Sequence, residues 1–203
     1  MASGRMEFHA DTIMQHTNFS FVIPNDFILE EIKEPRYYDR PAKSLILLHG
    51  LTGTDTDWLF GGVAQEMSKQ YNLAVFMPTT GNSFYLDHGY EGGNFASFVG
   101  EELPEYIRDT FGYCLSREDT MIAGLSMGSG GAMKCAMLHP ELYRTALIMS
   151  GGGMRLHRDN DVWAKEFLKK VIEGEDVEKD YPSAEANPKE DVNMAVPFYY
   201  QLK

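Results

Sequence analysis

Residues 124–128 of the chain, Gly124-Leu125-Ser126-Met127-Gly128, form a G-x-S-x-G pattern that decides the fold. The segment before it, 120–123, is short, apolar and bounded by turn-forming residues, which predicts a buried strand. The segment after it, 129–138, consists mainly of small and helix-forming residues. A strand, this pattern and a helix in that order predict a sharp turn that lifts the serine hydroxyl clear of the backbone. The alternative interpretation is a glycine-rich turn with an incidental serine.

A second segment supplies what an attacking serine would need. Residues 44–48 predict another buried strand, which runs into His49-Gly50-Leu51-Thr52-Gly53. When a serine attacks a carbonyl group, the carbonyl oxygen becomes negatively charged, and fixed backbone N–H dipoles stabilise it best. We predict Ser126 as the nucleophile and the N–H groups of Leu51 and Met127 as the oxyanion hole. His49 could instead be the catalytic base, but its motif indicates a residue that shapes the loop.

Apolar strands and helices alternate along the chain from residue 44 onward. Strands are predicted at 44–48, 73–77, 120–124 and 145–150, with helices near 59–70, 95–110 and 130–138. An antiparallel pair at 7–10 and 18–24 is expected before them. This order predicts a single α/β domain over residues 1–203, with a mostly parallel sheet and helices on both faces. Such sheets bind ligands at the carboxyl ends of their strands, where both glycine-rich segments lie.

Aromatic and acidic residues occur in two further loops at that edge. Trp58, Phe84 and Tyr85 could form the wall of a substrate pocket, because such pockets are mostly apolar; alternatively they pack into the core. Asp55 and Asp57 could suggest a metal site, but no third ligand follows at a suitable spacing. We expect Asp57 to be a helix N-cap instead, and we expect neither a metal nor another cofactor.

Composition restricts the partners. The 203 residues carry a net charge of −12, which argues against nucleic acid and anionic membrane and favours a small neutral or weakly charged molecule. The two cysteines, Cys114 and Cys135, lie in apolar surroundings and indicate reduced thiols in a cytoplasmic protein. No apolar run approaches the ~20 residues that a membrane span requires.

The motifs at 47–53, 124–131 and 138–140 together resemble the esterase D-like branch of the α/β-hydrolases. That branch includes bacterial acetyl, tributyrin and feruloyl esterases and S-formylglutathione hydrolases, and the resemblance covers residues 6–203. It implies a serine carboxylesterase that hydrolyses short-chain acyl esters, such as acetyl esters, through an acyl-enzyme at Ser126. Two alternatives stay open: a thioesterase similar to S-formylglutathione hydrolase, and a catalytically incomplete ester-binding fragment.

The region after the last predicted strand differs in character. Residues 163–172 have apolar residues at helical spacing, and residues 173–191 are strongly acidic. The resemblance implies that residues 154–192 form a cap and connector over the pocket.

The resemblance also implies that the acid and the histidine of a catalytic triad follow the serine by many tens of residues. Because the chain ends at Lys203, we expect both of them, and the C-terminal strands of the fold, to be absent from it. His139 is expected about 20 Å from Ser126, at the far end of the helix. His157 lies on the correct edge of the sheet, but the only carboxylate between Ser126 and it, Glu141, belongs to the opposite edge. Asp159 or Asp161 could orient His157 only by breaking the usual order, nucleophile then acid then histidine. The missing strands would leave an apolar sheet edge, which a second copy of the chain could cover as a homo-oligomer.

Overall fold

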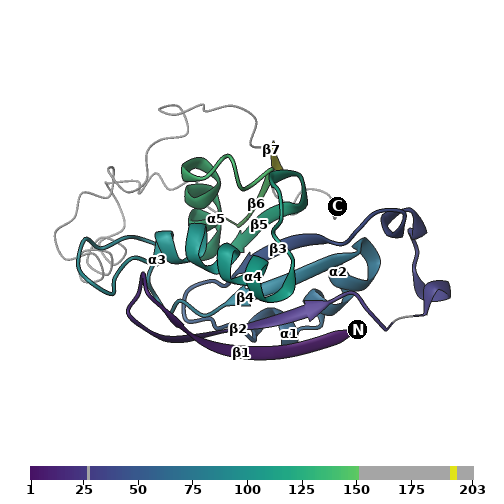
Figure 1. Cartoon of the computed structure of the whole chain (residues 1–203), viewed down its shortest axis with the longest axis horizontal. Coiled ribbons are helices and arrows are strands. Elements are labelled where there is room, and N and C mark those ends of the chain that lie inside the picture. The colour runs from purple at the N-terminus through teal and green to yellow at the C-terminus, as the bar shows by residue number, and fades with distance from the viewer. Residues whose placement is uncertain (27, 151–192, 196–203) are drawn as a thin grey trace.

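A computed structural model describes residues 1–26, 28–150 and 193–195 of the chain (Figure 1). The strands are β1 (Ala2–Ala10), β2 (Gln15–Ile23), β3 (Lys43–Leu48), β4 (Leu73–Pro78), β5 (Thr120–Leu125), β6 (Thr145–Met149) and β7 (Asn193–Ala195). The α-helices are α1 (Asp57–Phe60), α2 (Val63–Tyr71), α3 (Phe95–Ser97), α4 (Leu103–Phe111) and α5 (Met127–Leu138). Short 3-10 helices are η1 (Leu29–Glu31), η2 (Pro35–Tyr38) and η4 (Arg117–Asp119), and η3 (Phe98–Glu102) is a π-helix.

The seven strands of the described residues form one sheet in the order β1-β2-β4-β3-β5-β6-β7. The pairs β1–β2 and β2–β4 are antiparallel, and every other neighbouring pair is parallel. The predicted mostly parallel α/β sheet is therefore confirmed. In the centre, Leu48 of β3 is paired with Gly124 of β5, so the two glycine-rich segments begin side by side at one edge of the sheet.

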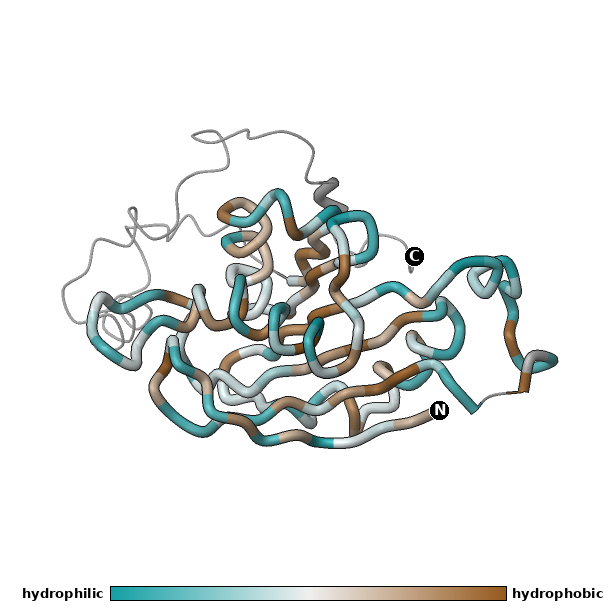
Figure 2. The backbone as a smooth tube through the Cα atoms, viewed as in Figure 1, coloured by the Kyte–Doolittle hydropathy of each residue, from teal (hydrophilic) through white to brown (hydrophobic). Residues whose placement is uncertain are grey.

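The side chains of β3 alternate between two hydrophobic cores, one on each face of the sheet. Leu45 and Leu47 belong to the core that α2 covers, whereas Ile46 and Leu48 belong to the core under α4 and α5. Because successive residues of a strand point to opposite faces, a strand covered on both sides must be apolar throughout. Hydrophobic residues accordingly follow the central strands, and many loops are hydrophilic (Figure 2).

Two predicted helices are interrupted in the structure. The helix near 59–70 is divided into α1 and α2 at Gly61 and Gly62, the latter with φ 72°. The helix near 95–110 consists of α3, the π-helical turn η3 and α4, with Pro104 in the first turn of α4. Proline has no N–H to donate to the carbonyl four residues earlier, so the regular α-helical hydrogen bonding is interrupted before this position.

The two ends of the sheet also differ from expectation. The antiparallel pair is longer than predicted, since β1 and β2 pair from Ala2 with Ile23 to Ala10 with Gln15. The strand β6 pairs with β7 over residues 145–147 and is therefore not an open edge there. The predicted cap and connector, 154–192, lies outside the described residues. Within those residues, no helix combines the length and the apolar character needed to cross a membrane.

Candidate active site

Ser126 lies between the last residue of β5 and the first residue of α5. Its backbone has φ 54° and ψ −112°, a conformation that L-residues rarely adopt and that costs about 1–3 kcal/mol. Hydrogen bonds hold it on both sides: its N–H donates to the carbonyl of Met149 (2.9 Å), and its carbonyl accepts the N–H (3.0 Å) and the hydroxyl (2.5 Å) of Ser129. The side chain is exposed.

The glycines beside Ser126 allow the helix to start this close to the sheet. A Cβ atom at Gly124 would lie 2.0 Å from the carbonyl oxygen of Gly128. A Cβ atom at Gly128 would lie 2.6 Å from the carbonyl oxygen of His49 and 2.7 Å from that of Leu48. Both distances are far below van der Waals contact, so only glycine fits at either position.

The loop after β3 packs against this turn. A Cβ atom at Gly50 would lie 3.7 Å from the Cβ of Ser126 and 3.4 Å from the carbonyl oxygen of Leu125. Leu51, the next residue, is half-buried, and Met127 is buried. Within the described residues, the N–H groups of Leu51 and Met127 donate no hydrogen bond. The structure thus brings the segments of all three predicted residues together.

His49 is fixed inside the loop by both of its ring nitrogens. Its Nε2 accepts the backbone N–H of Thr80 (3.1 Å), so the ring proton is on Nδ1, which donates to the carbonyl of Gly50 (2.7 Å). Burial lowers the pKa of His49, which keeps the ring neutral. Since neither nitrogen is available to Ser126, the structure excludes His49 as the base and makes it a residue that shapes the loop.

Thr52, in the loop after β3, is a second residue with strained backbone, beside Ser126. Thr52 has φ 64°, which is unusual for a β-branched residue, and its N–H donates to Oδ1 of Asn82 (2.8 Å). Asn82 belongs to the loop after β4, as does Thr80. Neither contact could be predicted from the sequence, because nothing near Thr80 or Asn82 indicates a partner some thirty residues earlier.

The two aspartates of this loop are both engaged with protein groups. The prediction that Asp57 is an N-cap is wrong: Thr56 occupies that position, and the Asp57 carboxylate accepts the N–H and the hydroxyl of Thr54 (both 3.2 Å). The buried carboxylate of Asp55 is bound by Arg5, Ser20 and other donors. Within the described part of the chain, no three His, Cys, Asp or Glu residues are grouped to hold a metal ion.

The predicted pocket aromatics all contact the core. Tyr85 is fully buried, its hydroxyl donates to the carbonyl of His49 (3.0 Å), and its ring lies against Gly131. Of the two interpretations, packing into the core therefore holds for Tyr85. Phe84 is half-buried against the same core. Trp58 is half-buried in the opposite core and donates its Nε1–H to the carbonyl of Leu48 (3.3 Å). A substrate contact of Phe84 or Trp58 stays a prediction.

A cavity of about 530 Å³ opens beside this loop. It is lined by the start of β2, the loop after β4 and the segment 88–95. Thr80 and Asn82, which bind the loop after β3, form part of its wall. The sequence could not predict the cavity, because residues 15–18 lie some sixty positions before the other residues that line it.

The histidines after Ser126 do not complete the site in the described part of the chain. His139 directly follows α5, thirteen positions after Ser126, and its Nδ1 lies 3.4 Å from Oε1 of Glu101 and 3.6 Å from Oε1 of Glu141. At 1.5 Å per residue this places it about 20 Å from Ser126. His157 lies outside the described residues.

Known proteins resemble this chain over most of its length. The profile of the Esterase family, described as "Putative esterase", matches residues 12–196. An acetyl esterase of Caldicellulosiruptor saccharolyticus is 37% identical over 163 residues, which are 78% of this chain and 59% of that protein. An S-formylglutathione hydrolase of Paracoccus denitrificans (strain Pd 1222) is 34% identical in an alignment of 154 positions that covers 66% of this chain and 54% of that protein.

Solved structures give the same result. The substrate-bound structure of FphF, a fluorophosphonate-binding serine hydrolase of Staphylococcus aureus, superposes with a TM-score of 0.62 and 27% identity, covering 74% of this chain and 57% of that one. The chain thus spans little more than half the length of these relatives. Because the family profile matches most of the sequence, the chain belongs to the Esterase family, in the esterase D-like branch of the α/β-hydrolases.

Proposed function

We propose that this chain carries the nucleophile and the oxyanion hole of a serine esterase that hydrolyses short-chain acyl esters. The observation that carries the proposal is the conformation of Ser126, an exposed serine at φ 54° at the start of a helix, against which the loop after β3 packs. Residues with strained backbone of this kind are concentrated at functional sites. Membership of the Esterase family and the similarity to an acetyl esterase support the proposal.

In the proposed reaction, Oγ of Ser126 attacks the ester carbonyl while a histidine takes its proton. The N–H groups of Leu51 and Met127 stabilise the negative charge on the carbonyl oxygen. The alcohol leaves, and water then hydrolyses the acyl-enzyme. No cofactor takes part. In the order nucleophile, acid, histidine, the base follows Ser126 in the chain. Among the described residues only His139 does so, and it lies beside Glu101 and Glu141 at the far end of α5, so the proposed base comes from outside the residues that the structure describes.

A thioesterase similar to S-formylglutathione hydrolase is the second candidate. The observation in its favour is the 34% identity to the enzyme of Paracoccus denitrificans. The same nucleophile and the same N–H donors serve an alcohol or a thiol leaving group, because both act at the acyl carbon. The ligand that we propose in either case is a small molecule and neither nucleic acid nor membrane, which a net charge of −12 would repel.

A fluorophosphonate probe, which reacts with activated serines, tests the proposal directly. Because the nucleophile and the N–H donors are present but the base lies outside the described residues, we expect slow labelling of the wild-type chain, no labelling of Ser126→Ala and an unchanged rate in Ser116→Ala, an exposed serine before β5. Labelling of Ser126→Ala would contradict the assignment. Absence of both labelling and ester hydrolysis in the wild type would favour the ester-binding fragment instead.

A substrate panel separates the candidates. p-Nitrophenyl acetate, butyrate and octanoate and S-formylglutathione would be compared by kcat/KM. We expect acetate and butyrate to be hydrolysed faster than octanoate, because the loops at 55–58 and 79–87 are bulky. Faster hydrolysis of S-formylglutathione than of every ester would favour the thioesterase.

A further inference from the structure

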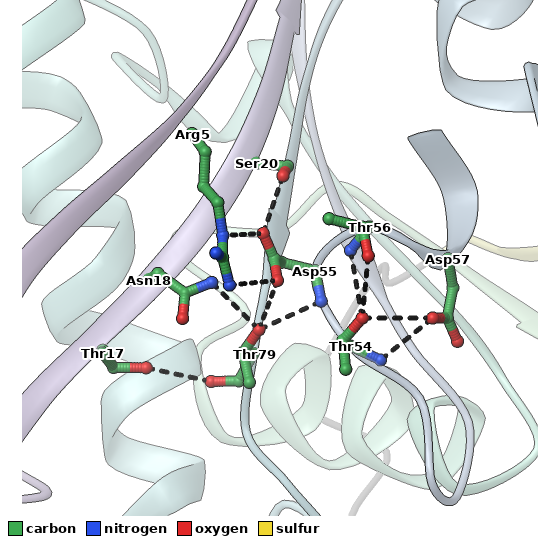
Figure 3. Close-up of polar contacts among 9 residues, drawn as sticks. All are labelled: Arg5, Thr17, Asn18, Ser20, Thr54, Asp55, Thr56, Asp57 and Thr79. Carbon is green, nitrogen blue, oxygen red and sulfur yellow. Dashed lines mark hydrogen bonds and ion pairs between the residues drawn. The ribbon is translucent and has the colours of Figure 1, made fainter. Parts of the chain in front are cut away.

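The carboxylate of Asp55 is the most heavily bonded buried charge near the proposed oxyanion hole. It lies four residues after Leu51, and its side chain is completely buried. Oδ2 accepts Nε of Arg5 (2.8 Å) and the hydroxyl of Ser20 (2.7 Å), and Oδ1 accepts Nη2 of Arg5 (3.1 Å) and the hydroxyl of Thr79 (2.8 Å) (Figure 3). Four donors therefore satisfy the two oxygens.

These contacts tie the loop after β3 to three other strands. Arg5 comes from β1, Ser20 from β2, and Thr79 directly follows β4. The backbone N–H of Asp55 donates in return to the hydroxyl oxygen of Thr79 (3.0 Å), which also accepts Nδ2 of Asn18 (3.2 Å) (Figure 3). The position of Asp55 is thus fixed through both its side chain and its backbone.

The electrostatics favour the charged form of the Asp55 carboxylate. Burial alone would raise the pKa of Asp55, but the hydrogen bonds from Ser20, Arg5 and Thr79 and the charge of Arg5 outweigh it, and the pKa lies below the ordinary value. A buried charge that is paired and fully hydrogen-bonded resists movement, because every shift would break a charge-assisted bond.

The loop between β3 and α1 is consequently held at both ends. At its start, His49 is bound by Thr80 and the strained Thr52 by Asn82. At its far end, Asp55 is bound by Thr79, which precedes Thr80 in the same loop after β4. Leu51 lies between these anchors, so they determine the direction of its N–H.

We propose that Asp55 is a positioning residue: through its contacts with Arg5, Ser20 and Thr79 it holds the loop so that the N–H of Leu51 faces the substrate oxygen. This inference rests on the proposed esterase function. An oxyanion hole acts mainly in the transition state, so its misplacement lowers kcat and leaves KM nearly unchanged. A displacement of about 1 Å can reduce the rate about a hundredfold.

The test compares Asp55→Asn with Asp109→Asn, an exposed aspartate on α4, and with Ile107→Ala, a core truncation on α4 that lowers stability away from the loop. We expect Asp55→Asn to lower kcat about 10- to 100-fold with KM changed less than about twofold. Both controls keep a kcat close to that of the wild type. A loss in Asp55→Asn no larger than in Ile107→Ala, or a change confined to KM, would overturn the proposal.

Thr79→Val removes this hydrogen bond from the other side, together with the bonds that the Thr79 hydroxyl accepts from the N–H of Asp55 and from Asn18. Because the two groups act as one unit, the double variant should lose little more kcat than Asp55→Asn alone, whereas independent effects would multiply. If the kcat of the double variant falls by the product of the two single losses, the proposal is contradicted.

Hydrogen exchange of the peptide 49–57 gives a readout that does not need activity. We expect faster exchange there in Asp55→Asn, and wild-type exchange in Asp109→Asn. If the wild-type chain hydrolyses no ester, the proposed function fails while this measurement still decides the loop's support. Unchanged hydrogen exchange of this peptide in Asp55→Asn would refute the proposed role of Asp55.

Discussion

Gly128 approaches the end of β3 so closely that a Cβ atom there would lie 2.7 Å from the carbonyl oxygen of Leu48. This contact sets the height of α5 above the sheet. It therefore also sets where Met127, the first residue of that helix, presents its N–H.

Gly128→Ala should damage both stability and labelling. The added methyl group meets backbone atoms that cannot move aside, so we expect unfolding to require about 1–3 kcal/mol less, as overpacking of a core does. Chemical denaturation and fluorophosphonate labelling would measure the two effects. Gly61→Ala is the control, since its nearest contact would be an ordinary 3.6 Å. Equal stability of the two variants would contradict the argument.

Ser126→Gly should be more stable than the wild type although it loses the nucleophile. Glycine adopts positive φ without the steric cost that serine bears, so we expect a gain of about 1 kcal/mol. The variant Ser129→Gly, in the first turn of α5, should instead be about 1 kcal/mol or more less stable, because glycine is a poorer helix former and the hydrogen bond to the carbonyl of Ser126 is lost. Thermal unfolding of both would check the prediction, and a destabilised Ser126→Gly would show that the turn is not strained.

Two buried tyrosines offer a controlled comparison. Tyr85 donates its hydroxyl to the carbonyl of His49 and Tyr143 to that of Val99, both at 3.0 Å and both with fully buried side chains. Either change to Phe should cost about 1–3 kcal/mol, because it leaves a buried carbonyl unpaired. Only Tyr85→Phe should also lower kcat/KM, because only His49 belongs to the loop after β3. A comparable loss of kcat/KM in Tyr143→Phe would argue against this.

His49 should make stability depend on pH. Its pKa is below the ordinary 6.5 in the folded protein, so in the window below pH 6.5 the unfolded chain binds a proton that the folded chain does not. Stability should therefore fall as the pH decreases through this window, down to the folded pKa. His49→Asn should show a shallower slope in denaturation measured from pH 7 to pH 5. Parallel slopes for the two proteins would be the contrary result.

The sequence predicted the central strands well, because a strand buried on both faces is a continuous apolar run, as in residues 44–48. The turn at Ser126 was also predictable, since its constraints are local: the two glycines and the serine lie within five residues. Helix interruptions were less visible. Pro104 is visible in the sequence and could have indicated an interruption, but the apolar residues continue at helical spacing on both sides of it.

Contacts between distant segments could not be predicted. Arg5 and Asp55 are 50 positions apart, and the surroundings of neither residue indicate the other. Asp57 was assigned to a helix N-cap because aspartate is common there, yet its carboxylate turns back to Thr54. The aromatic residues 84 and 85 were ambiguous for a similar reason, since a loop aromatic can point inward or outward. Tertiary packing decided each of these cases.

The way in which the loop occupies His49 has a consequence for chemical modification. Diethyl pyrocarbonate reacts with an imidazole nitrogen whose lone pair is free, and the lone pair on Nε2 of His49 accepts the N–H of Thr80 inside the protein. His49 should therefore be among the slowest histidines to be acylated in the folded chain. If the reagent abolishes ester hydrolysis and a competitive inhibitor protects against it, the modified residue will be a different histidine, and mass spectrometry of the acylated peptide would identify the base directly.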